Sequence, residues 1–138
     1  MAARIVIGGR DANMRSLLEY RLRDAGYSVV VSPDSADAWA RARVEQPDLV
    51  ILDLSIPYSD AKLILEQIEA GDRSQSPPVL ILSTYRADEL QGDCPMEGVE
   101  FVLKPFSPRQ LVADVAQIVG IESSQAEGEQ KDSPGSKD

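Results

Sequence analysis

The segment that decides the fold class is PDLVILDL, residues 47–54. Its apolar residues from Leu49 to Leu52 form an unbroken run, and Asp53 follows directly. A strand with one solvent-facing side would alternate polar and apolar residues, so an unbroken run indicates a strand buried on both faces, as in a parallel sheet. The segment therefore predicts a central parallel strand that ends in a carboxylate.

Similar apolar runs lie on both sides of this segment along the chain, at residues 4–7, 28–31, 79–82 and 101–103. Apolar stripes with helical spacing separate or follow these runs, at residues 14–25, 36–44, 61–68 and 111–119. The alternation predicts an α/β fold with helices on both faces of a parallel sheet. Between the fourth and fifth strands, Gly92, Pro95 and Gly98 interrupt the chain, so we expect a fourth helix that is short or irregular.

The length and charge of the chain restrict its class. Its 138 residues fit one domain, which we place at residues 1–119, and the polar segment 120–138 is expected to be a disordered acidic tail. The net charge of −9 argues against nucleic acid or an anionic membrane surface as a partner. The chain has no histidine, a single cysteine (Cys94) and no long apolar run, so we expect a cytoplasmic protein without histidine-based catalysis.

Chemically active side chains follow the predicted strands. In a doubly wound sheet, ligands bind beyond the carboxyl ends of the strands. The residues at these ends are Gly9 and Arg10, then Asp53, then Ser83 and Thr84, then Lys104. A buried carboxylate needs a partner, which Lys104 or Arg10 could supply. The sequence thus predicts that a carboxylate, a hydroxyl and an ammonium group converge at one edge of the sheet.

Three segments together carry a family resemblance. They are residues 47–54 with Pro57 four positions after Asp53, residues 78–83 (PVLILS) and residues 101–106 (FVLKPF). In this order and spacing, the chain from about residue 4 to residue 119 resembles the receiver domain of two-component response regulators. The resemblance implies a flavodoxin-like sheet of five parallel strands in the order 2-1-3-4-5.

The resemblance also implies roles for single residues. Asp53 matches the residue that accepts a phosphoryl group from a histidine kinase. Ser83, with Thr84 beside it, and Lys104 match the positions that bind the phosphoryl group. Phe101 matches an aromatic residue that changes rotamer on activation, and the bond between Lys104 and Pro105 is expected to be cis.

The chain departs from this family at the end of its first strand. The family has two adjacent acidic residues there, which hold Mg²⁺ together with the phosphoacceptor, whereas this chain has Gly9 and Arg10. Asp53 and the main-chain carbonyl of Ser55 are then too few ligands for an ion that requires near-octahedral oxygen coordination. We therefore expect an atypical pseudo-receiver with weak or absent Mg²⁺ binding and no cofactor. Asp11 lies one position late and is expected to cap a helix.

Several alternatives follow from these departures. We hypothesise an ion cluster of Arg10, Asp53 and Lys104; the other arrangement leaves Arg10 in solvent and Asp53 paired with Lys104 alone.

The first functional hypothesis is a non-enzymatic module that binds other signalling proteins, either a histidine kinase or a downstream effector, without phosphorylation. The irregular fourth helix, part of the family's usual dimer surface, suggests a rebuilt partner surface.

Two further functional hypotheses remain. The second is a working receiver, phosphorylated on Asp53 by a histidine kinase with weak or no Mg²⁺ dependence, in which Arg10 takes part of the metal's role. The third, more remote, is a nucleotide-binding enzyme on a Rossmann-like sheet. Gly8 and Gly9 suggest it, but Asn13 stands where a further glycine would be needed. The sequence gives neither the partner's identity nor the oligomeric state.

Overall fold

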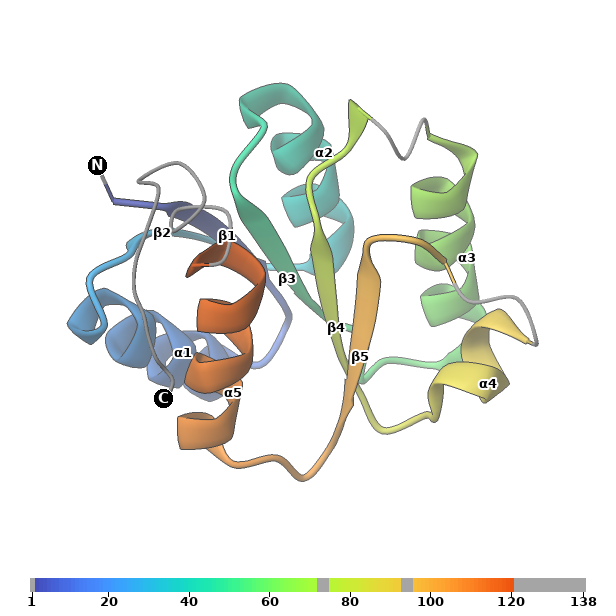
Figure 1. The fold of residues 1–138 in the computed structure, drawn as a ribbon. Coiled ribbons are helices and arrows are strands. Elements are labelled where there is room, and N and C mark those ends of the chain that lie inside the picture. Colours follow the sequence, from blue (N-terminus) through green and yellow to red (C-terminus); the bar gives the residue numbers. More distant parts are fainter. Residues whose placement is uncertain (1, 72–74, 93–95, 121–138) are drawn as a thin grey trace.

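The computed structural model describes residues 2–71, 75–92 and 96–120. Its strands are β1 (Arg4–Gly8), β2 (Ser28–Ser32), β3 (Leu49–Asp53), β4 (Val79–Ser83) and β5 (Val99–Leu103). They form one parallel sheet in the order β2-β1-β3-β4-β5 (Figure 1). The α/β class and the strand order expected from the sequence are confirmed.

Helices cover both faces of the sheet. They are α1 (Ala12–Asp24), α2 (Ser35–Glu45), α3 (Tyr58–Ala70), α4 (Ala87–Gln91) and α5 (Pro108–Val115), which continues as a π-helical turn, Ala116–Gly120. The packing clusters place α1 and α5 on one face and α2, α3 and α4 on the other. Asp11, Asp34 and Ser107 each accept main-chain N–H groups at a helix start, so the expected cap at Asp11 is confirmed.

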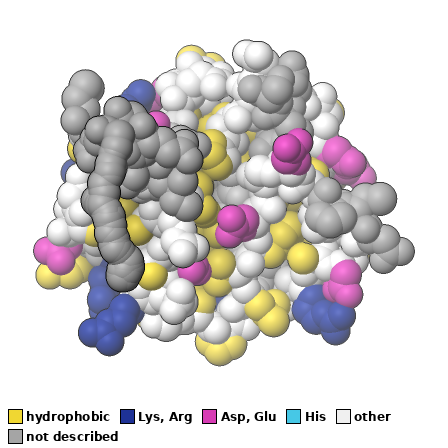
Figure 2. All heavy atoms as spheres, viewed as in Figure 1, with side chains coloured by type: hydrophobic (Ala, Val, Ile, Leu, Met, Phe, Trp, Pro, Cys, Tyr) yellow, Lys and Arg dark blue, Asp and Glu magenta, His cyan; other side chains and the backbone are white. Residues whose placement is uncertain are grey.

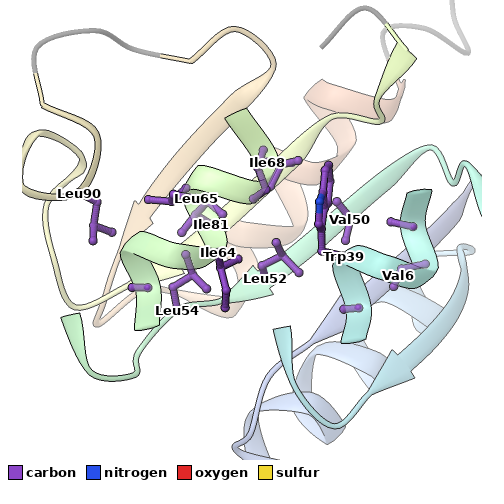
Figure 3. Close-up of a cluster of buried hydrophobic side chains, with 14 residues drawn as sticks. Val6, Trp39, Val50, Leu52, Leu54, Ile64, Leu65, Ile68, Ile81 and Leu90 are labelled. Carbon is purple, nitrogen blue, oxygen red and sulfur yellow. The ribbon is translucent and has the colours of Figure 1, made fainter. Parts of the chain in front are cut away.

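The central strands form the middle of the core. Every residue of β3 and β4 is buried. Figure 3 shows the half of the core under α2 and α3, where Val50, Leu52 and Ile81 of the sheet meet Ile64 and other helix side chains. The indole of Trp39 lies in this cluster and is 2% exposed, so the only tryptophan of the chain is a core residue.

Some expectations about the outer elements were wrong. The runs at β2 and β5 were expected to be buried on both faces, but both strands are partly exposed because each lies at an edge of the sheet. The short fourth helix is confirmed, since α4 has five residues. Gly120 ends the last helical turn instead of beginning the tail. Residues 121–138 of the predicted tail lie outside the described residues. Cys94 and Pro95, in the segment before β5, also lie outside them. Within them, no helix has the length and apolar character that a membrane span requires.

Candidate functional site

A buried ion pair forms the centre of the site. Asp53 ends β3, and its Oδ2 lies 2.9 Å from Nζ of Lys104, which follows β5. The two side chains are only 8% and 17% exposed. The other carboxylate oxygen, Oδ1, accepts the main-chain N–H of Ser55 at 3.0 Å. Both oxygens of Asp53 therefore have partners within the chain, and the predicted pairing with Lys104 is confirmed.

The main chain around this pair is held on both sides. The hydroxyl of Ser35, at the start of α2, donates to the main-chain oxygen of Asp53 at 2.8 Å. The main-chain N–H of Lys104 donates to the carbonyl of Ser83 at 2.8 Å, which joins the ends of β4 and β5. The bond between Lys104 and Pro105 is cis, as expected.

Arg10 does not join this pair. It lines an open hollow of about 280 Å³, which we call the Asp53 hollow. The lining residues are Arg10, Asp11, Asp53, Ser55, Ile56 and Lys104. Among the described residues, however, Arg10 makes no ion pair within 4.0 Å, so the hypothesis of an ion cluster was wrong. Both oxygens of Asp53 are already bonded, and an exposed arginine gains little from a further surface pair.

The glycines at the end of β1 are explained by close packing. A Cβ atom on Gly9 would lie 2.8 Å from Cβ of Asp53. A Cβ atom on Gly8 would collide with Cβ of Ala38 and lie 2.9 Å from the carbonyl oxygen of Asp34. The glycine pair thus lets both α2 and Asp53 approach β1. This packing role accounts for the two glycines without the phosphate-binding loop of the nucleotide hypothesis.

The predicted hydroxyl residues lie outside the Asp53 hollow. The side chain of Ser83 is fully buried, and its Oγ accepts the main-chain N–H of Tyr85 at 2.7 Å. Thr84 is exposed and lines a separate, apolar hollow of about 370 Å³ beside Pro105. Asp53 and Lys104 therefore meet at the edge of the sheet, as predicted. Ser83 and Thr84 are not among the residues that line the Asp53 hollow.

Phe101 is half-buried and packs against the core cluster under α3. It lies in the middle of β5. A change in the rotamer of this ring on activation stays a prediction.

Tyr85 is a link that sequence reasoning missed. Its hydroxyl donates to the carbonyl of Ile56 at 3.1 Å, so it joins the loop after β4 to the loop after Asp53. Its ring meets that of Tyr58 edge to face, with centroids 5.5 Å apart. Tyr58 and Lys62 of α3 in turn donate to carbonyls at the end of α4, at 2.8 and 2.7 Å. These bonds hold α4 against α3. The spacing of apolar residues in the sequence does not predict them, because they are polar contacts between a side chain and a distant main-chain carbonyl.

Comparison with known proteins gives one family. The chain matches the model of the response regulator receiver domain over residues 6–116. It is 30% identical over 121 residues to the alkaline phosphatase synthesis transcriptional regulatory protein PhoP of Bacillus subtilis, covering 86% of this chain and 49% of that protein. It is 32% identical over 114 residues to the probable transcriptional regulator ycf27 of Galdieria sulphuraria, covering 81% and 43%. The chain thus spans about half the length of these relatives.

Solved structures agree on the fold. The chemotaxis response regulator CheY4 of Vibrio cholerae superposes with a TM-score of 0.69 at 23% identity, over 86% of this chain and 99% of that one. The solution structure of a response regulator protein from Burkholderia multivorans gives a TM-score of 0.67 at 28% identity, over 86% and 95%.

Proposed function

Because the chain belongs to the response regulator receiver family, we propose that it is a signalling module that binds its partner without metal-assisted phosphorylation. The observation that carries the proposal is the packing at the end of β1. Gly9 offers no side chain toward Asp53, and a Cβ atom there would stand 2.8 Å from that of Asp53. The space that a metal-binding carboxylate would need is therefore taken by the chain itself.

The donor set around Asp53 also fits Mg²⁺ poorly. The ion requires near-octahedral oxygen coordination, and proteins usually bind it through one or two carboxylates. Here Oδ2 of Asp53 holds Lys104, Oδ1 holds the N–H of Ser55, and the carboxylate of Asp11 accepts two N–H groups at the start of α1. These partners take up part of the acceptor capacity of the two carboxylates, and no further described carboxylate lines the Asp53 hollow. We therefore derive no step through a metal.

In this proposal the partner is another signalling protein, either a histidine kinase or a downstream effector. The net charge of −9 supports a protein partner over nucleic acid or an anionic membrane. A cytoplasmic location is part of the same proposal. The module performs no reaction: Lys104 neutralises the buried carboxylate of Asp53 and holds the site in one state.

The test is intact mass spectrometry of the full chain after incubation with acetyl phosphate, with Mg²⁺ and with a chelator. We expect no added phosphoryl mass in either condition. A titration with Mg²⁺ alone, followed by amide NMR, is expected to leave the resonances near Asp53 unchanged. A phosphoryl group on the wild type that is absent from Asp53→Ala would overturn the proposal, as would saturable shifts with Mg²⁺.

A second candidate function rests on the position of Arg10. Arg10 lines the Asp53 hollow and also a neighbouring hollow of about 260 Å³ between α2 and α3. Arginine binds phosphate in a planar fork, so this side chain could neutralise a phosphoryl group on Asp53 in place of a metal. The candidate is a working receiver that is phosphorylated by a histidine kinase with little dependence on Mg²⁺.

Two variants separate the candidates. If Arg10 replaces the metal, phosphorylation persists in chelator and is lost in Arg10→Gln but not in Arg109→Gln, an exposed arginine on α5 outside the hollow. If the chain works without phosphorylation, none of these proteins gains the phosphoryl mass. The result with the wild type in chelator decides between the two functions.

A further inference from the structure

We propose that the hollow between α2 and α3 binds a free basic amino acid, such as arginine or lysine. We call it the α2–α3 hollow; its volume is about 260 Å³, and it shares Arg10, Asp53 and Ile56 with the Asp53 hollow beside it. This volume is just below the range of about 300–1,000 Å³ that is typical of ligand pockets, so it suits a ligand smaller than a drug molecule. The inference goes beyond the proposed function, because it requires neither phosphorylation nor its absence.

Three elements bring charged side chains to the α2–α3 hollow. Arg10 comes from the loop after β1, Asp34 caps α2, and Asp60 lies in the first turn of α3. Asp53 also lines the hollow, but the ammonium group of Lys104 at 2.9 Å neutralises its carboxylate. One positive and two negative charges remain. An amino acid with a basic side chain is complementary to them, because at about pH 7 it carries two positive charges and one negative charge.

The charged groups of the hollow are available to a ligand. Among the described residues, neither Arg10 nor Asp60 makes an ion pair within 4.0 Å or a side-chain hydrogen bond. Asp60 is half-buried, so its carboxylate has lost part of its hydration without gaining a partner in that part of the chain. Asp34 accepts the main-chain N–H of Asp37 with Oδ1 at 2.7 Å, which leaves Oδ2 for a cation.

Apolar side chains line the same hollow. Ile64 is buried, Ile56 is half-buried and Leu63 is 57% exposed. Arginine and lysine have a stem of about three or four CH₂ groups below the charged end, and such a stem covers apolar surface while the charged end stays polar-solvated. A basic amino acid therefore matches both the charges and the apolar lining of the hollow.

Negative charge alone does not single out this hollow. Figure 2 shows Asp and Glu side chains spread over the visible face among apolar and uncharged atoms, in keeping with the net charge of −9. The α2–α3 hollow is distinguished by an arginine that lines it together with carboxylates that have free oxygen atoms. Within the described residues, no three side chains of Asp, Glu, His or Cys lie close enough to hold a metal ion. The carboxylates of the hollow are thus suited to an organic cation.

The first experiment is an amide NMR titration of the full chain with L-arginine up to about 20 mM at constant ionic strength, because a small ligand in an open site binds weakly. We expect saturable shifts at Ala36 and Gln67, which line the hollow, with a Kd of about 1 mM. Agmatine lacks the carboxylate of arginine, and citrulline lacks its charged side chain. Each is expected to bind at least about fivefold more weakly than L-arginine, because it loses one charge-assisted contact.

The second experiment repeats the titrations with variants of the hollow. Arg10→Gln is expected to weaken arginine binding at least about fivefold and to leave agmatine binding unchanged, because its partner is the carboxylate of the ligand. Asp60→Asn is expected to weaken arginine binding to the same extent and to leave citrulline binding unchanged. Arg43→Gln and Asp37→Asn are the matched controls, since both side chains are exposed on α2 outside the hollow. Circular dichroism checks that the variants are folded.

Several results would overturn the proposal. They are shifts that do not saturate, citrulline that binds as tightly as arginine, and control variants that weaken binding as much as Arg10→Gln or Asp60→Asn. Agmatine that binds as tightly as arginine would also overturn it, because the hollow would then suit a cationic side chain of a partner protein. The comparison of the ligands needs only the wild-type chain, so it decides the proposal even where a variant does not fold. These titrations contain no phosphoryl donor, so their outcome is separate from that of the proposed function.

Discussion

Replacing Lys104 by methionine tests whether the ion pair with Asp53 is a structural element of the fold. Methionine keeps most of the length and apolar contact of the lysine side chain while it removes the charge. The carboxylate of Asp53, 8% exposed, then loses the ammonium group that lies 2.9 Å away. We expect the variant to fold with a clearly lower free energy of unfolding.

The magnitude follows from the geometry. Two unit charges 2.9 Å apart attract by about 6 kcal/mol at an effective dielectric of about 20. Desolvation offsets most of that attraction, but removing one partner of a buried pair leaves the other charge uncompensated, at a cost of about 3–5 kcal/mol. The N–H of Ser55 remains, and the Asp53 hollow of about 280 Å³ admits water. We therefore expect a loss of about 2–3 kcal/mol, below the range for fully enclosed pairs.

The assay is urea denaturation followed by the fluorescence of Trp39, the single tryptophan, which is 2% exposed. Arg41→Met is the control, because it removes an exposed pair with Glu45 at 3.8 Å and should cost less than about 0.5 kcal/mol. The double variant Asp53→Asn with Lys104→Met should regain at least half of the loss, since no buried charge remains. A loss for Lys104→Met as small as that of the control would refute the reasoning.

Three further substitutions probe the surroundings of the site by the same denaturation assay. Asp11→Ala removes the cap of α1 and should cost about 1 kcal/mol; no loss would show that water replaces the cap. Tyr85→Phe removes the bond to Ile56 and should also cost about 1 kcal/mol, and an unchanged midpoint would contradict the link between the two loops. Gly9→Ala brings a Cβ atom to 2.8 Å from that of Asp53 and should cost about 1–3 kcal/mol; a neutral result would mean that β1 shifts freely.

The sequence predicted the parts of the site that depend on topology. Asp53 and Lys104 each follow a strand, and parallel strands end at the same edge, so their meeting required only the strand order. The position of Arg10 depends instead on the rotamers of a long exposed side chain, which no spacing in the sequence fixes. The exposure of β5 was missed because an apolar run reads the same at an edge as at the centre of a sheet.

Packing around the glycine pair links the end of β1 to the rest of the domain. Gly8 lets Ala38 of α2 reach β1, and Gly9 lets Asp53 sit against the end of that strand. A carboxylate introduced at position 9 would therefore have to move Asp53, whose oxygens already accept from Lys104 and from the N–H of Ser55. Because interiors are close-packed and yield little, such a change displaces several partners together. The two glycines at the end of β1 are thus matched to their neighbours, and a side chain at either position would disturb contacts with α2 or with Asp53.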